Sequence, residues 1–325
     1  MKKILVSGIK PTGEMHIGNY FGALRQFVEL QDKFESYIFV ADLHALTTVQ
    51  NREEMQENIF NTVVAYLACG LDPEKVVLYK QSDVPQVAEL GWIFNCLTTM
   101  PYLMRAHAFK DAEAKNKEIN VGVFNYPMLM AADILIQDAD VVPVGQDQKQ
   151  HIEITRDTAE KFNRIFESDA LKIPEAYILE NVATVPGTDG QKMSKSYNNT
   201  IPLFATDEEI EKAVMGIVTD SLGRSPTGEP GVRRPENVYA MHKLFKSEAE
   251  LDKLYAEKEG RYKELKEALI EDIKVFIAPL RERRNELLKD RNAVLDIIKR
   301  GGEKARERAE SKMKMVREVT GLTLK

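Results

Sequence analysis

The stretch ILVSGIKPTGEMHIGNYFGALRQFVELQD, residues 4–32, decides the fold class. Its apolar start, Ile4 to Ser7, is typical of a buried strand, and a loop that contains glycines and a proline follows from Gly8 to Gly18. The pattern then predicts a helix from about Asn19 to Asp32. A strand that leads through a glycine-containing loop into a helix is typical of strand–helix–strand units.

The same alternation continues through the first half of the chain. Apolar runs at Tyr37–Ala41, Val76–Tyr79 and Val141–Val144 predict three further strands. Between the first two of them, Asn51 with Glu54 three residues later predicts the capped start of a helix. Strands that alternate with helices predict an α/β fold with a Rossmann-like parallel sheet.

Two stretches outside this alternation are mostly helical in pattern, one between the third and fourth strands and one from Thr206 onward. Residues 85–135 are mostly helical in pattern and are too long for a simple crossover, so we interpret them as a helical insertion. Thr206 and Glu209 predict another helix cap, and beyond Tyr239 the pattern is helical and highly charged. We therefore predict a Rossmann-type domain at residues 1–200, with its insertion at about 85–135, and a helical C-terminal domain at 201–325 whose last helix can pack back on the first.

Composition excludes several classes of protein. The 325 residues carry a formal net charge of −6, so any nucleic acid must bind through local basic patches. No apolar run reaches the roughly 18 residues that a membrane span needs, and we expect a cytoplasmic protein. The two cysteines, Cys69 and Cys96, form no CxxC pair, so we expect no protein-bound zinc or iron–sulfur cluster.

Two short motifs carry the chemistry. The first is Lys10-Pro-Thr-Gly-Glu-Met-His-Ile-Gly-Asn-Tyr20, where a glycine loop opens a helix and can present backbone N–H groups to an anion. The second is Gly187-Thr-Asp-Gly-Gln-Lys-Met-Ser-Lys-Ser196, a glycine-framed loop with two lysines that can neutralise charge on a departing pyrophosphate. Each motif alone also fits an ordinary turn or a solvated basic loop.

Together, His16-Ile-Gly-Asn19 and Lys192-Met-Ser-Lys-Ser196 resemble the two signature motifs of class I aminoacyl-tRNA synthetases. Residues 126–135, Tyr-Pro-Met-Leu-Met-Ala-Ala-Asp-Ile-Leu, and residues 142–157, which begin Val-Pro-Val-Gly-Gln-Asp, narrow the resemblance to the tryptophanyl-tRNA synthetase family. The resemblance implies activation of L-tryptophan with Mg²⁺-ATP, transfer to the 3′ end of tRNA(Trp), and a homodimer.

The resemblance also implies roles for individual residues. His16 and Asn19 would stabilise the phosphates during attack by the tryptophan carboxylate, Lys192 and Lys195 would hold the β- and γ-phosphates, and Lys110 would lie nearby. The ATP-binding positions that it implies are Lys10, Pro11, Thr12, Gly18, Asn19, Gly145, Gln146, Asp147, Val185, Lys192, Met193, Ser194, Lys195 and Ser196. Three residues depart from the usual pattern: Asn19 replaces histidine, Lys10 a frequent glutamine and Gln146 a frequent glutamate.

Asp133 is the residue on which amino-acid specificity would depend. It follows Met130 by three positions, so both lie on one helix face. A buried carboxylate can accept the indole N–H, and a site built for that hydrogen bond would discriminate against phenylalanine. The tryptophan-binding residues that we expect are Asp133, Met130, His44, Val142, Val144 and Gln148. The alternatives are a surface or capping aspartate, a plain core for the apolar residues and a structural histidine at His44.

Basic residues that could bind tRNA do not stand out as one cluster, because glutamates are interspersed among them. The candidates are Arg224, Arg233, Arg234, Arg281, Arg283, Arg284, Lys299 and Arg300. Three other functions stay open at this point: a tyrosyl-tRNA synthetase, a small nucleotidyltransferase that shares the first motif, and a non-catalytic paralogue that only binds tRNA. The length of the second domain argues against the nucleotidyltransferase, and intact His16, Lys192 and Lys195 argue against the paralogue.

Overall fold

The computed structural model describes residues 2–106, 109–110, 113, 119–145, 149–178, 185–219 and 235–324. The chain forms two compact units. The first consists of Met1–Gly13, Phe27–Asn181 and Asp290–Lys325, and the second of Glu14–Gln26 and Val182–Lys289. The predicted boundary at residue 200 stays a prediction, because each unit is built from separate stretches of the chain.

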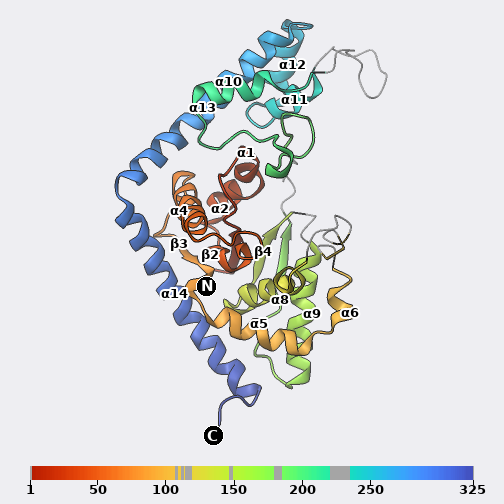
Figure 1. Cartoon of the computed structure of the whole chain (residues 1–325), viewed down its shortest axis with the longest axis vertical. Helices are drawn as coiled ribbons and strands as arrows, with labels where there is room; N and C mark the ends of the chain where they lie inside the picture. Colours follow the sequence, from red (N-terminus) through yellow and green to blue (C-terminus); the bar gives the residue numbers. More distant parts are fainter. Residues whose placement is uncertain are drawn as a thin grey trace. The chain divides into compact units, whose positions relative to one another are not determined.

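A five-stranded parallel sheet, of which Figure 1 labels β2, β3 and β4, forms the centre of the first unit. Its strand order is β3-β2-β1-β4-β5. The strands are β1 (Ile4–Ile9), β2 (Glu35–Val40), β3 (Val76–Lys80), β4 (Val141–Val144) and β5 (Glu175–Ile178). The parallel α/β fold is thus confirmed. The chain adds β2 and β3 on one side of β1 and then returns to add β4 on the other, so the strand order reverses between β1 and β4. Ligands of such sheets bind at the carboxyl ends of the strands beside this reversal.

Helices cover the sheet of the first unit. They are α3 (Asp42–Ala45), α4 (Arg52–Ala68), the 3₁₀ turn η2 (Gln81–Asp83), α5 (Gln86–Leu97), α6 (Met100–Leu103), α8 (Val121–Ile136), α9 (Lys149–Ile165) and α14 (Arg291–Val319). Asn51 caps α4 as predicted, since its side chain accepts a hydrogen bond from the Glu54 backbone N–H at 2.9 Å. None of the helices in the described ranges is long and apolar enough to cross a membrane.

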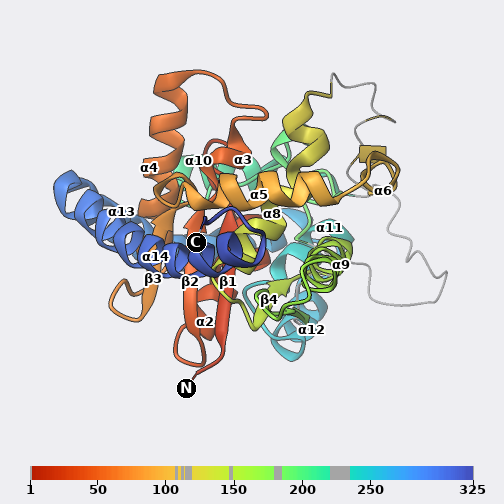
Figure 2. The ribbon, with the colours of Figure 1, turned by 90° about the horizontal axis from the view of Figure 1, so that it is seen from below.

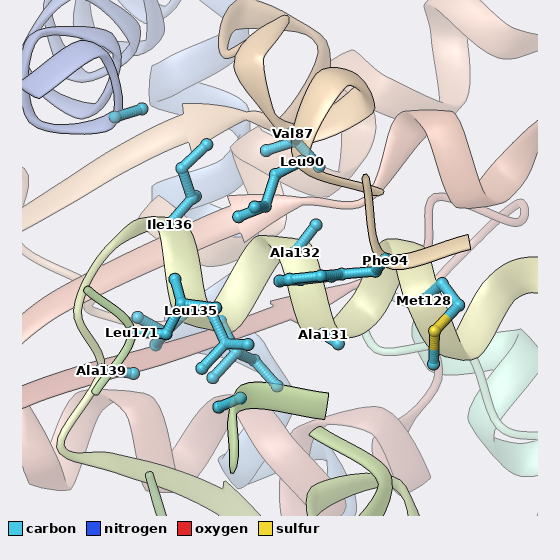
Figure 3. Close-up of a cluster of buried hydrophobic side chains, with 14 of the residues drawn as sticks. Val87, Leu90, Phe94, Met128, Ala131, Ala132, Leu135, Ile136, Ala139 and Leu171 are labelled. Atoms are coloured by element: carbon cyan, nitrogen blue, oxygen red, sulfur yellow. The ribbon is translucent and has the colours of Figure 1, made fainter. Parts of the chain in front are cut away.

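The core of the first unit lies where α5 packs on α8 (Figure 2). Val87, Leu90 and Phe94 of α5 are buried against the α8 face that contains Ala132 and Ile136 (Figure 3). The two helices are in van der Waals contact at Gly91, where a Cβ would lie 3.9 Å from the Cβ of Ala132. This contact fixes α8, which carries Asp133, against the rest of the unit.

The last helix, α14, packs on β3 and α5 within the first unit. Gly301 makes the approach possible, because a Cβ there would lie 1.8 Å from the carbonyl oxygen of Leu78 in β3. Ion pairs flank this contact, with Lys312 bound to Asp138 at 2.5 Å and Arg317 to Glu89 at 2.6 Å. The helix therefore covers the edge strand β3, which would otherwise expose its backbone.

The second unit is helical apart from its loops. Its elements are α1 (Ile17–Asn19), the π-turn η1 (Tyr20–Leu24), the 3₁₀ turn η4 (Lys195–Tyr197), α10 (Asp207–Met215), α11 (Glu236–His242), α12 (Glu248–Glu257) and α13 (Tyr262–Lys289), while α2 (Arg25–Leu30) runs from this unit into the first. The single helix predicted from Asn19 to Asp32 is therefore three consecutive pieces. In the π-turn the rings of Tyr20 and Phe21 both contact Phe276 of α13, with centroids 4.9 and 5.4 Å apart.

Candidate active site

The first motif is held by backbone hydrogen bonds to residues that follow the second motif. Within the second unit, the Ile17 N–H donates to the Ile201 carbonyl at 3.0 Å, and the Leu203 N–H donates to the Met15 carbonyl at 2.8 Å. His16 lies between these bonds, and its backbone N–H donates to Oδ1 of Asn19 at 3.0 Å. Asn19 therefore fixes the turn that places His16.

The two motifs meet at Gly18. A Cβ on Gly18 would lie 2.8 Å from Nδ1 of His16 and 3.3 Å from Sδ of Met193. No side chain fits at this position without displacing the His16 ring. The sequence predicts that the two loops converge, and within the second unit they do so.

Asn199 organises the loop of the second motif. It is almost fully buried, its side-chain amide donates to Oδ1 of Asp189 at 2.7 Å and to the Lys192 carbonyl at 3.1 Å, and its Oδ1 accepts the Ser194 N–H at 2.7 Å. The Met193 N–H donates to the Val185 carbonyl at 2.8 Å. Sequence reasoning missed Asn199 and Asp189, because a buried polar scaffold inside a loop has no periodicity to reveal it.

Burial and charge set the protonation of His16. Burial, and to a smaller extent the positive charge of Lys195, lowers the pKa of His16 to about 4. The imidazole is therefore neutral at pH 7 and keeps one donor and one acceptor nitrogen. Its buried Nδ1 has no hydrogen-bond partner within the described part of the chain. Burial also lowers the pKa of Lys195, and the carboxylate of Glu14 acts in the opposite direction.

The other predicted ATP contacts divide between the two units. In the first unit, Nζ of Lys10 donates to Oγ1 of Thr47 at 2.9 Å, and burial lowers the pKa of Lys10. Pro11 is buried, Thr12 and Lys110 are exposed, and Gly145 directly follows β4.

In the second unit, Val185 is buried, Lys192, Lys195 and Ser196 are exposed, and the hydroxyls of Ser194 and Ser196 lie 2.9 Å apart. Gln146, Asp147 and Gln148 lie outside the described residues.

A buried polar cluster in the first unit is built around Asp133 of α8. The carboxylate is 2% exposed and lies 3.1 Å from Nε2 of His44 and 2.8–2.9 Å from Nε2 of Gln81. Burial raises the pKa of Asp133, and the hydrogen bonds from His44 and Gln81 oppose this rise. Asp133 is therefore neither a surface carboxylate nor a helix cap.

Aromatic rings contact His44 of this cluster, and apolar residues pack in the hydrophobic core that includes α8. Val142 and Val144 of β4 are buried in the same hydrophobic core, and Met130 is partly buried against it. The ring of Tyr126 lies edge-on to His44, and its hydroxyl is 2.9 Å from Nε2 of His151. Sequence reasoning assigned no role to Tyr126, although residues 126, 130 and 133 recur at helical spacing. Gln81 was also missed, although it follows β3 directly at the carboxyl edge of the sheet.

The basic candidates for tRNA binding differ in their surroundings. Arg281 donates to the Ala205 carbonyl at 2.6 Å and to Asp207 at 2.8 Å, so it holds α13 to the start of α10. The guanidinium of Arg284 lies over the ring of Phe204. Arg283, Lys299 and Arg300 are exposed, and Arg224, Arg233 and Arg234 lie outside the described residues.

Comparison with known proteins places these features in one family. Residues 2–278 match the class I tRNA synthetases for tryptophan and tyrosine (W and Y). The chain is 48% identical to a tryptophan–tRNA ligase of Fusobacterium nucleatum, over 99% of this chain and 98% of that protein, and 46% identical to one of Rhodopirellula baltica, over 98% and 99%. The crystal structure of tryptophanyl-tRNA synthetase from Campylobacter jejuni, complexed with ADP and tryptophan, superposes with a TM-score of 0.87 at 40% identity, covering 98% of this chain and 99% of that one. The chain therefore belongs to the tryptophanyl-tRNA synthetases of class I.

Proposed function

We propose that the two motif loops and the Asp133 cluster divide the work of a tryptophan–tRNA ligase between them. In the first step a carboxylate oxygen of L-tryptophan attacks the α-phosphorus of ATP, and pyrophosphate leaves with the bonding electrons. In the second step the activated tryptophan is transferred to the 3′ end of tRNA(Trp), and AMP leaves. The observation that carries the proposal is the contact of Gly18 with both His16 and Met193, which brings the first motif against the lysine-bearing loop.

The motif residues act on ATP through position and charge. The substrate carboxylate is itself the nucleophile, so the enzyme supplies orientation and electrostatic stabilisation. Neutral His16 donates a hydrogen bond to a phosphate oxygen, while Lys192 and Lys195 balance the charge that develops on pyrophosphate. ATP enters as its Mg²⁺ complex, with the ion held by the phosphate oxygens as part of the substrate.

The Asp133 cluster selects the amino acid. A carboxylate oxygen of Asp133 accepts the indole N–H, and Met130, Val142 and Val144 contact the apolar part of the ring. A tyrosine side chain carries its polar atom at a different place and lacks this donor, which favours tryptophan over the tyrosyl alternative. Three relatives that are 41–48% identical over 98–99% of this chain are named tryptophan–tRNA ligases, which supports the same choice.

Replacing Lys195 tests the catalytic proposal. Lys195→Ala should lower the rate of tryptophanyl-adenylate formation by about a hundredfold or more, because the charge on the leaving pyrophosphate loses a partner. The measurement is single-turnover adenylate formation with saturating ATP and tryptophan. Lys289→Ala, which removes an exposed lysine from the end of α13, is the matched control. An unchanged rate in Lys195→Ala would contradict the proposal and would favour a chain that only binds tRNA.

A homodimer is supported by exposed apolar side chains in the insertion. Trp92 of α5 is 69% exposed, and Met100 and Val121 are exposed at the starts of α6 and α8. Large contiguous apolar surfaces are rare on soluble monomers, and we propose that these three side chains belong to one such surface that contacts a second copy. A monomeric mass in light scattering at working concentrations would contradict it.

The helical residues 201–325 are the proposed tRNA-binding domain, with the reaction placed in the cytoplasm, where protein synthesis supplies tRNA. The proposal favours Arg283 as a phosphate contact over Arg281 and Arg284, because the latter two guanidinium groups already bind within the second unit. Phosphate contacts of this kind weaken as the salt concentration rises. Aminoacylation whose KM for tRNA is independent of salt would contradict the electrostatic part of the proposal.

A further inference from the structure

Gln81 is completely buried and uses both ends of its side-chain amide. Its Oε1 accepts the backbone N–H groups of Leu43 at 3.0 Å and of His44 at 3.2 Å. Its Nε2 lies 2.9 Å from Oδ1 and 2.8 Å from Oδ2 of Asp133. Only this orientation of the amide satisfies all four contacts, because two backbone donors face one end and a carboxylate faces the other.

The turn that carries Gln81 is joined to the start of α3 by a second set of bonds. Asp42 accepts the Ser82 N–H at 2.9 Å and the Ser82 hydroxyl at 2.5 Å. His44, two residues after Asp42, then reaches back to Asp133 at 3.1 Å. The carboxylate is therefore held from two directions by a turn and a helix that are themselves fixed to each other.

This arrangement limits what the carboxylate can still accept. A carboxylate offers about four lone-pair positions. The Gln81 amide occupies up to two of them and His44 one, which leaves about one for a substrate. Because Gln81 is tied to the backbone of α3, it also fixes the rotation of the carboxylate about its own bond.

We propose that Gln81 is a positioning residue for tryptophan selection, which holds Asp133 so that one acceptor position faces the indole N–H. The inference rests on the proposed role of Asp133, and it adds that Gln81 orients the Asp133 carboxylate. Glutamine suits this task because it combines an acceptor for backbone N–H groups with a donor for a carboxylate. Glutamate has the same shape and the acceptor but lacks the donor.

The substitution Gln81→Glu keeps the shape of the side chain, replaces that donor with an acceptor oxygen and adds a negative charge beside Asp133. We expect the KM for tryptophan in ATP–pyrophosphate exchange to rise by about 10- to 100-fold, which is the loss that a charge-assisted hydrogen bond predicts. The KM for ATP should change by less than about threefold. The matched control is Gln31→Glu, because Gln31 is also a buried glutamine that links backbone groups, from Gly70 to Asp72, without touching Asp133.

The sulfur analogue 3-(1-benzothiophen-3-yl)alanine separates ring N–H recognition from general fit. It has nearly the shape of tryptophan but no ring N–H. The wild-type chain should prefer tryptophan in kcat/KM by about a hundredfold or more. In Gln81→Glu this preference should fall by about tenfold or more, whereas Gln31→Glu should keep it.

A paired substitution tests the positioning directly. In Asp133→Asn, the amide of Gln81 turns the Asn oxygen toward itself, so the Asn NH₂ faces the indole N–H and tryptophan binds poorly. Adding Gln81→Glu reverses the Asn amide, because the new carboxylate attracts the NH₂ group. The double variant should therefore recover kcat/KM for tryptophan by about tenfold over Asp133→Asn alone. This comparison carries the test if Gln81→Glu by itself does not fold.

The possible outcomes distinguish the role inferred for Gln81 from the role proposed for Asp133. If the wild-type ratio of kcat/KM for tryptophan to that for the sulfur analogue is near one, both the role of Asp133 and that of Gln81 are overturned. A large wild-type preference that Gln81→Glu retains would overturn the role of Gln81 alone, as would a double variant no better than Asp133→Asn. Loss of the preference together with rescue in the double variant supports the inference, since a purely structural glutamine would give neither.

Discussion

At the scale of single residues, burial shifts the pKa of two groups to which we assign substrate contacts. Burial lowers the pKa of His16 to about 4, whereas it raises the pKa of Asp133 against the hydrogen bonds of His44 and Gln81. A neutral imidazole can donate to phosphate without adding charge, and the positive charge is left to the lysines of the second motif. Because Lys195 contributes to the lowered pKa of His16, the two motifs are coupled electrostatically.

The coupling predicts how His16 titrates. In the wild-type chain, NMR of the imidazole Cε1–H, assigned with His16→Asn, should show no titration of His16 between pH 7.5 and about 5.5. Lys195→Met should raise the pKa, because a nearby positive charge is lost, yet keep it below the usual value of about 6.5, because burial is the larger cause. The stabilisation from neutral His16 is complete above about pH 6.5 and is lost as the pH falls toward 4. Titration of His16 near pH 6.5 in the wild type would refute this account.

At the scale of elements, two close approaches position the working parts. Gly18 lets the His16 ring lie against the loop of the second motif, and Gly301 lets α14 lie on β3. Both contacts join segments that are distant in sequence, at a point where a side chain would not fit. The site and the fold therefore require glycine at these two positions, in addition to the charged residues of the motifs.

Replacing Gly301 tests the second contact. Gly301→Ala places a Cβ 1.8 Å from the Leu78 carbonyl oxygen, so α14 must move and the apparent melting temperature should fall by about 3–10 °C, as overpacking predicts. The control is Gly22→Ala, where a Cβ meets nothing within 4 Å, and there the reduced freedom of the unfolded chain should raise the free energy of unfolding by up to about 1 kcal/mol. Differential scanning calorimetry makes the comparison. Equal melting temperatures for the two variants would show that α14 does not need this approach.

Hydrophobic periodicity predicted the strands and helix caps that depend on local sequence alone. Strands β1 to β4 are apolar runs, and the Asn51 cap is a local hydrogen bond, so both were predictable. Strand β5 was missed because its four residues are only half-buried at the edge of the sheet. The predicted helix from Asn19 contains a π-turn, where aromatic packing on Phe276 replaces regular spacing.

The residues of the candidate site also fall into two groups, those that motifs predict and those that only the structure reveals. Short motifs with charged residues pointed to His16, Lys195 and Asp133. The residues that hold them, such as Gln81 and Asn199, depend on contacts between segments distant in sequence, and no local pattern predicts them.

At the scale of the whole molecule, the chain is acidic, so the positive charges that bind anions must act locally. The net charge of −6 repels tRNA, so we expect tRNA binding to depend on exposed basic groups such as Arg283, while Lys192 and Lys195 lie in one loop of the second unit. In our proposal both units contribute residues, since Lys10 and Asp133 belong to the first unit and His16, Lys192 and Lys195 belong to the second.

ATP–pyrophosphate exchange with tryptophan, tyrosine and phenylalanine in parallel tests the central claim most directly. The account predicts that tryptophan supports exchange and that the other two are at least about a hundredfold lower in kcat/KM, because neither presents an N–H to Asp133. Exchange with tyrosine within about threefold of that with tryptophan would contradict it, as would no exchange with any of the three.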